Sequence, residues 1–286
     1  MTAVTSLRGA IAAAERTLAG AGVPSPRHDA EELAAHVLGV ERRELIRHDA
    51  LDATAHAALE RLVGRRAGRE PLQHITGRAH FRHLVLAVGP GVFVPRPETE
   101  VVAGAAIAAA REAAAAQRPP VVVDLGAGSG AIALSVAEEA PAAQVFAVEA
   151  DDAALAWARR NLAGSGVRLV RADLASCLPE LDGAVDVVVS NPPYIPEGAQ
   201  IRDPEVAAHD PPGALWSGVD GLTAIRAVEE AAARLLRPGG VAVVEHADLQ
   251  GESAPGVFRA ARRWVAVTDH EDLTGRPRFL TAERAS

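Results

Sequence analysis

The spacing of apolar positions divides the chain into a helical part and a mixed part. Up to residue 77, apolar side chains recur about every three or four positions, as expected for helices that bury one face. No strand is expected between these helices. The pattern predicts a small helical domain over residues 1–77, with helices at 5–20, 26–39 and 52–67.

A short extended segment follows the helical part. Two apolar runs, residues 80–88 and 92–94, flank the sequence Gly89-Pro90-Gly91, in which glycine and proline favour a turn. We therefore expect a β-hairpin that serves as a linker over residues 78–100. A helix is expected to begin near Thr99, which could cap it, and to run to about residue 116.

Beyond residue 119, strands and helices alternate along the chain. The first strands are continuous apolar runs, as expected for a sheet that is covered on both faces. This alternation predicts a doubly wound α/β domain, which we place over residues 101–286. The expected strands are 121–125, 144–149, 168–171, 185–190, 239–245, 264–268 and 277–281, and the expected helices are 130–139, 152–163 and 220–236.

A glycine-rich turn joins the first of these strands to its helix. Its residues are Gly126, Ala127, Gly128, Ser129 and Gly130. Glycines permit a tight turn and close approach of a ligand to the backbone, and the free N–H groups of the following helix favour an anionic group. The spacing differs from the G-x-G-x-x-G of dinucleotide sites. It resembles the S-adenosylmethionine loop of class I methyltransferases.

Two acids stand at the ends of the next strands. Glu149, about 20 residues beyond the glycines, is placed to hold ribose hydroxyls. Asp173, after the third strand, is placed to meet an adenine, although by itself it could equally be a turn acid. Together with the glycine turn, the spaced acid Glu149 predicts a site for a nucleoside-type cofactor.

The fourth strand ends in a rigid polar corner, Asn191-Pro192-Pro193-Tyr194. Asparagine offers an acceptor oxygen, and proline has no N–H, so the carbonyls near it stay free to accept hydrogen bonds. The Asn191 oxygen and the Pro192 carbonyl could therefore hold both hydrogens of a planar amide or amino group, while Tyr194 covers it. The alternative is an ordinary strand-to-loop corner, since Asn-Pro often marks turns.

Composition excludes several classes of function. The 286 residues include one cysteine, Cys177, which rules out an internal disulfide framework and fits a reducing cytoplasm. A net charge of −8 argues against stable, non-specific binding to nucleic acid. No apolar run could span a membrane, no clustered His and Cys residues suggest a metal site, and the N-terminus lacks the layout of a secretory signal. We expect a cytoplasmic protein, a monomer without a membrane anchor.

A local cluster of arginines precedes the hairpin. The cluster has two interpretations: a solvated helix face, or a contact with an RNA-bound or acidic partner. Its members are Arg61, Arg65, Arg66, Arg69, Arg78 and Arg82.

Several motifs taken together resemble one family over nearly the whole chain. It is the HemK/PrmC family, the protein-(glutamine N5) methyltransferases that modify peptide chain release factors. The asparagine-proline corner alone is shared with nucleic-acid amino-methyltransferases, but its combination with the first two motifs is much more specific. The motifs are GREPLQHITG at 68–77, VPRPETE at 94–100, DLGAGSG at 124–130, SNPPYI at 190–195, GVDGL at 218–222 and DLTGR at 272–276.

The resemblance implies a class I, Rossmann-like, S-adenosylmethionine-dependent methyltransferase domain, preceded by a helical substrate-recognition domain and a hairpin linker. It further implies methylation of the glutamine in the Gly-Gly-Gln motif of release factors. The cofactor contacts carried over by position are Gly126, Ala127, Gly128, Ser129, Gly130, Glu149, Asp173, Leu174 and Asn191, and those to the glutamine amide are Asn191, Pro192, Pro193 and Tyr194.

The chain departs from the family pattern at three places. Glu149 replaces the usual aspartate, His74 stands where tyrosine is common, and His209-Asp210 stands where an aromatic-Glu pair is frequent. Two rival functions remain at this point. One is a nucleic-acid methyltransferase acting on adenine N6 or guanine N2, and the other is a nucleotide-binding protein without catalysis.

Overall fold

The computed structural model describes residues 5–114 and 118–286. By their contacts, these residues divide into two compact units. The helical unit comprises the chain up to Arg78 together with Ile201–His209, and the α/β unit comprises Ala79–Gln200 together with Asp210–Ser286. The segment 201–209 thus belongs to the helical unit, although sequence placed it within the catalytic domain.

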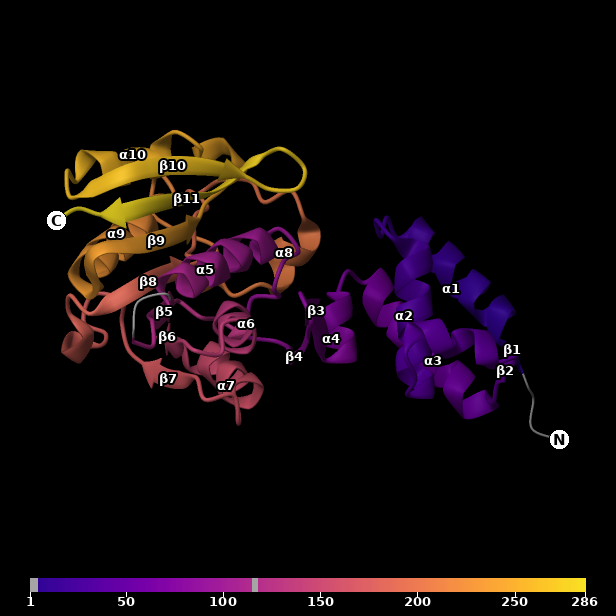
Figure 1. Cartoon of the computed structure of the whole chain (residues 1–286). Coiled ribbons are helices and arrows are strands. Elements are labelled where there is room, and N and C mark those ends of the chain that lie inside the picture. The colour runs from indigo at the N-terminus through magenta and orange to yellow at the C-terminus, as the bar shows by residue number, and fades with distance from the viewer. Residues whose placement is uncertain (1–4, 115–117) are drawn as a thin grey trace. The chain divides into compact units, whose positions relative to one another are not determined.

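The helical unit is built on the three predicted helices, which are confirmed within about two residues of the expected ends. Their apolar faces form one core, with Leu18 and Leu33 fully buried. The expectation of no strand was wrong, because β1 (Thr5–Ser6) pairs with β2 (Ala50–Leu51) in an antiparallel bridge. The helices are α1 (Leu7–Gly20), α2 (Pro26–Leu38), α3 (Ala53–Ala67), α4 (Leu72–Thr76) and α8 (Pro204–His209), with a 3-10 turn at Arg42–Arg47 (Figure 1).

Most arginines of the cluster form ion pairs with acidic side chains. Arg66 is buried, and its guanidinium lies 2.7 Å from Asp29 Oδ2 and 2.8 Å from Glu205 Oε1. Arg69 contacts the same Glu205 oxygen at 2.8 Å, and Arg65 pairs with Glu70. Arg65, Arg66 and Arg69 therefore stabilise the helical unit, and Glu205 attaches α8 to it.

The hairpin forms, but its turn is not where the sequence predicted. It consists of β3 (Arg78–Phe81) and β4 (Leu84–Ala87), so the chain turns at Arg82 rather than at Gly89–Gly91. Arg82 takes a left-handed φ of 52°, and its guanidinium binds both Glu139 oxygens at 2.6 and 2.9 Å. This long-range contact holds a conformation that usually requires glycine.

Gly89 serves packing instead of a hairpin turn. A Cβ atom at Gly89 would lie 2.6 Å from the Trp157 ring, so only glycine allows this approach. Residues 92–94, predicted as the second strand of the hairpin, form no strand.

The α/β unit contains a seven-stranded sheet with the order β10-β11-β9-β8-β5-β6-β7. Five neighbouring strands run parallel, and β11 is antiparallel to both β9 and β10. All seven predicted strands are confirmed, although the last three are longer than expected. They are β5 (Val121–Leu125), β6 (Gln144–Glu149), β7 (Arg168–Arg171), β8 (Val185–Ser190), β9 (Leu236–Glu245), β10 (Trp264–Glu271) and β11 (Pro277–Arg284).

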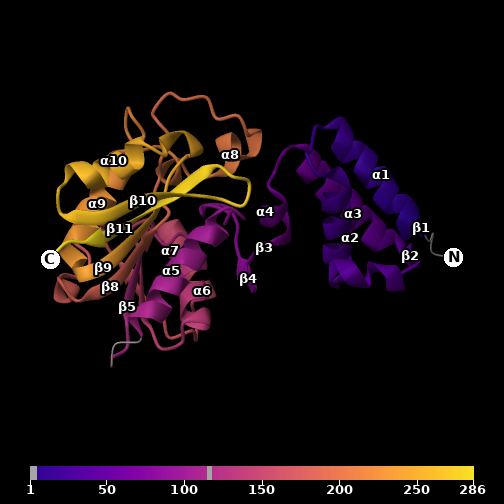
Figure 2. The same ribbon diagram turned by 45° about the horizontal axis from the view of Figure 1, so that its top comes forward.

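Helices cover both faces of this sheet, as the apolar strands predicted. Successive residues of β5 point to opposite faces: Val122 packs in the core beneath α5, α6 and α7, while Val123 packs beneath α9 and α10 (Figure 2). The predicted end of α5 near residue 116 lies outside the described residues. The helices are α5 (Thr99–Ala113), α6 (Ala131–Glu139), α7 (Asp152–Asn161), α9 (Thr223–Leu235) and α10 (Ser253–Ala260), with 3-10 turns at Pro179–Leu181, Pro212–Ala214 and Asp248–Gln250.

The buried pair of the helical unit yields a stability prediction. Arg66→Ala should lower the free energy of unfolding of that unit by about 3–5 kcal/mol, because it leaves Asp29 buried without a counter-charge. The control Arg27→Ala removes an exposed pair with Glu31 and should cost at most about 1 kcal/mol. Urea unfolding followed by circular dichroism measures both variants. Equal losses of unfolding free energy in the two would show that the buried pair stabilises the unit no more than the exposed pair.

Candidate active site

The glycine turn lies where β5 meets α6. Its three glycines have positive φ values of 72°, 56° and 84° at Gly126, Gly128 and Gly130. A Cβ atom at either of the first two would meet nothing within 4 Å, whereas one at Gly130 would press on Leu162 at 3.0 Å. The first two glycines therefore border open space, and the third is needed for packing.

Backbone contacts hold this turn against its neighbours. The N–H groups of Gly126 and Ala127 both donate to the Val148 carbonyl at 2.9 Å. Ser129 is buried, and its carbonyl accepts a hydrogen bond from Asn161 at 2.9 Å. The turn is thus fixed from the adjacent strand β6 and from the end of α7.

Glu149 ends β6 and is half-buried directly beside the turn. Its carboxylate accepts three backbone hydrogen bonds of 2.8 Å each, from Gly128, Ala150 and Asp151. A carboxylate has about four acceptor positions, so one remains for a ligand. Sequence reasoning assigned Glu149 to a ribose diol, and the structure adds that it holds the turn and the start of α7.

Asp124, one residue before the end of β5, is buried beneath the turn. Its Oδ2 accepts a hydrogen bond from Ala133 N at 3.0 Å, and its Oδ1 has no partner among the described residues. Burial, with a smaller contribution from the charge of Glu149, raises the pKa of Asp124 to about 7. Sequence reasoning treated this acid only as part of a motif.

Asp173 follows β7 and is exposed. Its Oδ1 accepts a hydrogen bond from Ala175 N at 2.9 Å, which is the geometry of a turn acid. Leu174 is half-buried against the core that lies beneath α9. Ala172 N donates to the carbonyl of Glu149 at 3.2 Å, so this loop begins beside the predicted ribose acid.

The asparagine-proline corner begins where β8 ends. Asn191 is half-buried, and its Nδ2 donates to Thr99 Oγ1 at 3.2 Å. Neither Asn191 Oδ1 nor the carbonyl of the buried Pro192 has a hydrogen-bond partner within residues 5–114 and 118–286. The corner therefore presents two unpaired acceptors, as its sequence predicted.

The half-buried residues Pro193 and Tyr194 complete the corner. Gln250 Nε2 donates to the Tyr194 carbonyl and to the Gly221 carbonyl, both at 3.2 Å. A Cβ atom at Gly221 would lie 2.6 Å from the Tyr194 carbonyl. Burial raises the pKa of the Tyr194 hydroxyl well above its usual value, so this side chain stays neutral. Gly221, which the sequence offered only as part of the GVDGL motif, and Gln250, which it did not single out, hold the corner in place.

Thr99 and Glu245 stand behind Asn191 and were not predicted as site residues. Thr99 was expected to cap α5, but it is the first residue of that helix, and its buried hydroxyl accepts a hydrogen bond from Asn191 Nδ2. Glu245 ends β9, the strand beside β8, and is 1% exposed. An acid that directly follows an apolar run at the end of a strand, as Glu149 also does, is the signal that could have found it.

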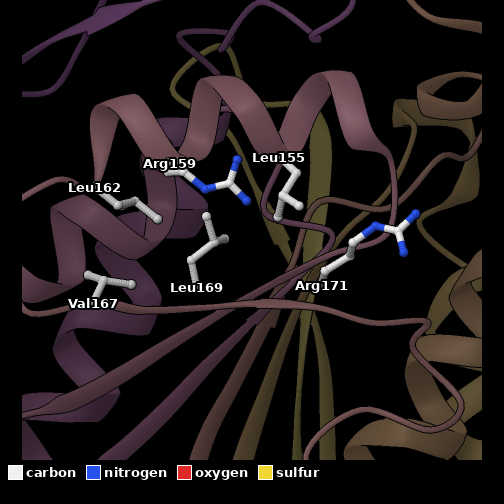
Figure 3. Close-up of a pocket in the computed structure, with 6 residues that line it drawn as sticks. All are labelled: Leu155, Arg159, Leu162, Val167, Leu169 and Arg171. Atoms are coloured by element: carbon white, nitrogen blue, oxygen red, sulfur yellow. The ribbon is translucent and has the colours of Figure 1, made fainter.

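A separate groove of about 420 Å³ lies between α7 and β7 (Figure 3). None of the predicted site residues is among those that line it: Leu155, Arg159, Leu162, Val167, Leu169 and Arg171. Within the described part of the chain, no group of His, Cys, Asp and Glu side chains could hold a metal ion. No helix among the described residues is long and apolar enough to cross a membrane.

Burial of Glu245 predicts a pH-dependent stability. Burial raises the pKa of Glu245 to about 8, so its favourable contribution is present at acid pH and is lost as the pH rises through about 8. Wild-type protein should lose about 3 kcal/mol more unfolding free energy than Glu245→Gln between about pH 5.5 and about pH 8.5. Urea titrations at both pH values test this, and identical pH dependence would contradict an ionisable buried Glu245.

Models of known families match two parts of the chain. Residues 9–77 match the PrmC N-terminal domain, and residues 90–207 match the methyltransferase small domain. Among solved structures, the Thermus thermophilus 16S rRNA N2 G1207 methyltransferase in complex with AdoMet and guanosine has a TM-score of 0.50 and 24% identity. The match covers 72% of this chain and 49% of that chain, and it shows the class I methyltransferase fold that the sequence predicted.

Curated relatives match at nearly full length. The release factor glutamine methyltransferase of Streptomyces coelicolor is 56% identical over 277 residues, which cover 96% of this chain and 97% of the relative. A 4-amino-L-phenylalanine/4-methylamino-L-phenylalanine methyltransferase of Streptomyces pristinaespiralis is 45% identical, over 92% of this chain and 90% of the relative. With this degree of identity over both units and an S-adenosylmethionine-type glycine turn beside the asparagine-proline corner, the chain belongs to the family of release factor glutamine methyltransferases.

Proposed function

We propose that this protein transfers a methyl group from S-adenosylmethionine to the side-chain amide nitrogen of a release factor glutamine, the one in the Gly-Gly-Gln motif. The observation that carries the proposal is the pair of unpaired acceptors, Asn191 Oδ1 and Pro192 O, at the end of the strand beside the glycine turn. Relatives that bear this name span nearly the whole chain, which supports the same acceptor.

The residues at the strand ends fit the cofactor. Gly126 and Gly128 border open space, and Glu149 keeps one acceptor position for a ribose hydroxyl. The unpaired Oδ1 of Asp124 is a further acceptor beneath the turn, and Asp173 with Leu174 would meet the adenine. When bound, S-adenosylmethionine supplies a methyl group on a positively charged sulfur, which is already activated toward nucleophiles.

The corner prepares the substrate amide for attack. An amide nitrogen is planar and a weak nucleophile, so its position decides the rate. Asn191 Oδ1 and the Pro192 carbonyl accept its two hydrogens, while Pro193 and the neutral Tyr194 shield it from water. No strong base is needed before attack, because the nitrogen proton can leave after the new bond has formed.

The helical unit is the proposed site of substrate recognition. We assign recognition to residues 1–77, the linker to residues 78–100 and catalysis to residues 101–286. By its contacts, the segment 201–209 belongs to the helical unit. A net charge of −8 disfavours the rival nucleic-acid substrate. A release factor substrate would place the enzyme in the cytoplasm, where translation terminates.

A first prediction concerns the acceptor. Purified protein with labelled S-adenosylmethionine should label a release factor and should leave its Gly-Gly-Gln variant with Gln→Ala unlabelled. Ribosomal RNA and free 4-amino-L-phenylalanine serve as competing acceptors, the second because a relative acts on it. Label on RNA alone or on the amino acid alone would reject the release factor and retain the same Asn191 chemistry.

A second prediction separates the two halves of the site. Asn191→Ala should lower kcat by at least about a hundredfold with cofactor affinity within about threefold, because it removes an acceptor that positions the amide. Glu149→Ala should instead weaken cofactor binding first, since it removes both the ribose acceptor and the contacts that hold the turn. Calorimetric titration with S-adenosylmethionine and steady-state kinetics test both, and unchanged affinity in Glu149→Ala would remove that acid from the cofactor site.

A further inference from the structure

We propose that Val219, Leu249 and Leu273 form an apolar docking surface on the α/β unit for the folded release factor, beside the corner that takes its glutamine. This inference rests on the proposed function and adds how the same site distinguishes a protein substrate from a free amino acid. The three residues lie in three separate loops. Two of these loops carry the GVDGL and DLTGR motifs of the sequence.

These three residues are the most exposed large apolar side chains among the described residues of the α/β unit. Val219, Leu249 and Leu273 are 87%, 92% and 94% exposed. The next two, Val85 and Val265, are 56% and 47% exposed and lie within strands. Single exposed apolar side chains are normal on a protein surface, whereas apolar side chains that gather in one region indicate a contact site. The positions of the three loops therefore decide between these two interpretations.

Hydrogen bonds join the first two loops to each other and to the asparagine-proline corner. Gln250 Nε2 donates to the carbonyls of Tyr194 and Gly221, both at 3.2 Å. Gly221 belongs to the loop of Val219. Gln250 directly follows Leu249. One side chain thus ties both loops to the backbone of the corner, and both exposed residues lie within two positions of that contact.

The third loop joins β10 to β11 and contains Leu273 (Figure 1). Because β11 is antiparallel to β9, the loop that precedes β11 lies at the carboxyl end of β9. A Cβ atom at Gly251 would lie 2.8 Å from the Pro277 Cβ atom, so the chain just after Leu249 contacts the first residue of β11. All three loops therefore adjoin one another at the edge of the sheet that holds the corner.

Short-range hydrogen bonds hold each loop in its conformation. Asp220 accepts from Leu222 N at 3.1 Å. Asp272 accepts from the N–H and the hydroxyl of Thr274 at 2.8 and 2.6 Å. The second loop is the 3-10 turn Asp248–Gln250. The exposed side chains are therefore placed before a partner arrives, which lowers the entropy that binding must overcome.

A folded release factor is the partner that fits this surface. The loops surround the corner, so a protein that presents a glutamine there must lie across them, whereas a single amino acid can fill the corner without contacting all three. The exposed side chains carry no charge, and their burial favours binding to an apolar face. We therefore expect the release factor to bring an apolar face beside its Gly-Gly-Gln loop.

Steady-state kinetics test the surface. Val219→Ser, Leu249→Ser and Leu273→Ser should each raise KM for the release factor by about threefold to tenfold, and the triple variant by at least about thirtyfold, because apolar contact is lost. The value of kcat and the cofactor affinity should stay within about twofold. Val85→Ser and Val265→Ser, the matched controls, should leave KM unchanged. Wild-type KM in the triple variant, an equal rise in the controls, or a loss confined to kcat would overturn the proposal.

Direct binding gives a second test that needs no turnover. Calorimetric titration with a release factor whose Gly-Gly-Gln carries Gln→Ala should show binding to the triple variant that is at least about tenfold weaker than binding to wild type. The melting temperature should stay within about 2 °C, since the substituted side chains are exposed. Equal binding would overturn the surface and leave the proposed function standing.

Sedimentation and wild-type activity separate the remaining outcomes. A wild-type dimer that the triple variant converts to a monomer would assign the surface to a second copy of this chain and overturn the proposal. Failure of the wild-type protein to methylate a release factor would reject the proposed function, and this surface with it.

Discussion

The pairing of β8 between β5 and β9 is the constraint on which the rest of the site depends. Leu125 is in register with Ser190, and Ser190 with Val244, so three strands end at one level. The Ser190 hydroxyl reinforces this level by donating to the Leu125 carbonyl at 2.6 Å. Because side chains alternate along a strand, a slip of one residue would send Asn191 and its neighbours to the wrong face. The glycine turn, the polar corner and Glu245 are neighbours for this reason.

Two acids at this edge, Glu149 and Asp124, are held by backbone N–H groups rather than by arginines. Glu149 accepts three backbone N–H bonds, and Asp124 accepts one. The opposite edge is different: Asp186, at the start of β8, binds the guanidinium groups of Arg118 and Arg237 at 2.7 Å. The ion pairs of Asp186 stabilise the fold, whereas Glu149 and Asp124 at the carboxyl edge each have an acceptor position without a protein donor among the described residues. That contrast identifies the edge where a ligand can be bound.

Rigidity at the corner comes from contacts that are distant in sequence. Gln250 and Gly221 hold the Tyr194 carbonyl, and Ile195 bridges to Trp216. A catalytic group that must aim a weak nucleophile needs such support, since small errors in position reduce the rate strongly. The Asn191 side chain receives its own support from Thr99. Backbone and side chain of the corner are therefore held by separate sets of residues.

The sequence by itself determined the elements and the chemistry that local patterns carry. Apolar runs that alternate with helical segments predicted all seven strands, and glycine spacing predicted the turn at 126–130. The asparagine-proline corner predicted two unpaired acceptors, because proline lacks a donor wherever it stands. These features depend on residues that are close together in the chain, so they could be recognised without coordinates.

Only the tertiary structure decided which distant residues meet. The hairpin turns at Arg82 and not at the predicted glycines. The ion pair with Glu139 stabilises the left-handed backbone of Arg82, which no local signal predicts. Thr99 was expected to cap a helix, and its hydroxyl instead accepts a hydrogen bond from Asn191. Hydrogen-bond partners in such cases are chosen by strand register and helix packing, which bring together groups that are far apart in sequence. Hydrophobic periodicity specifies each element separately and carries no record of which polar groups will face one another.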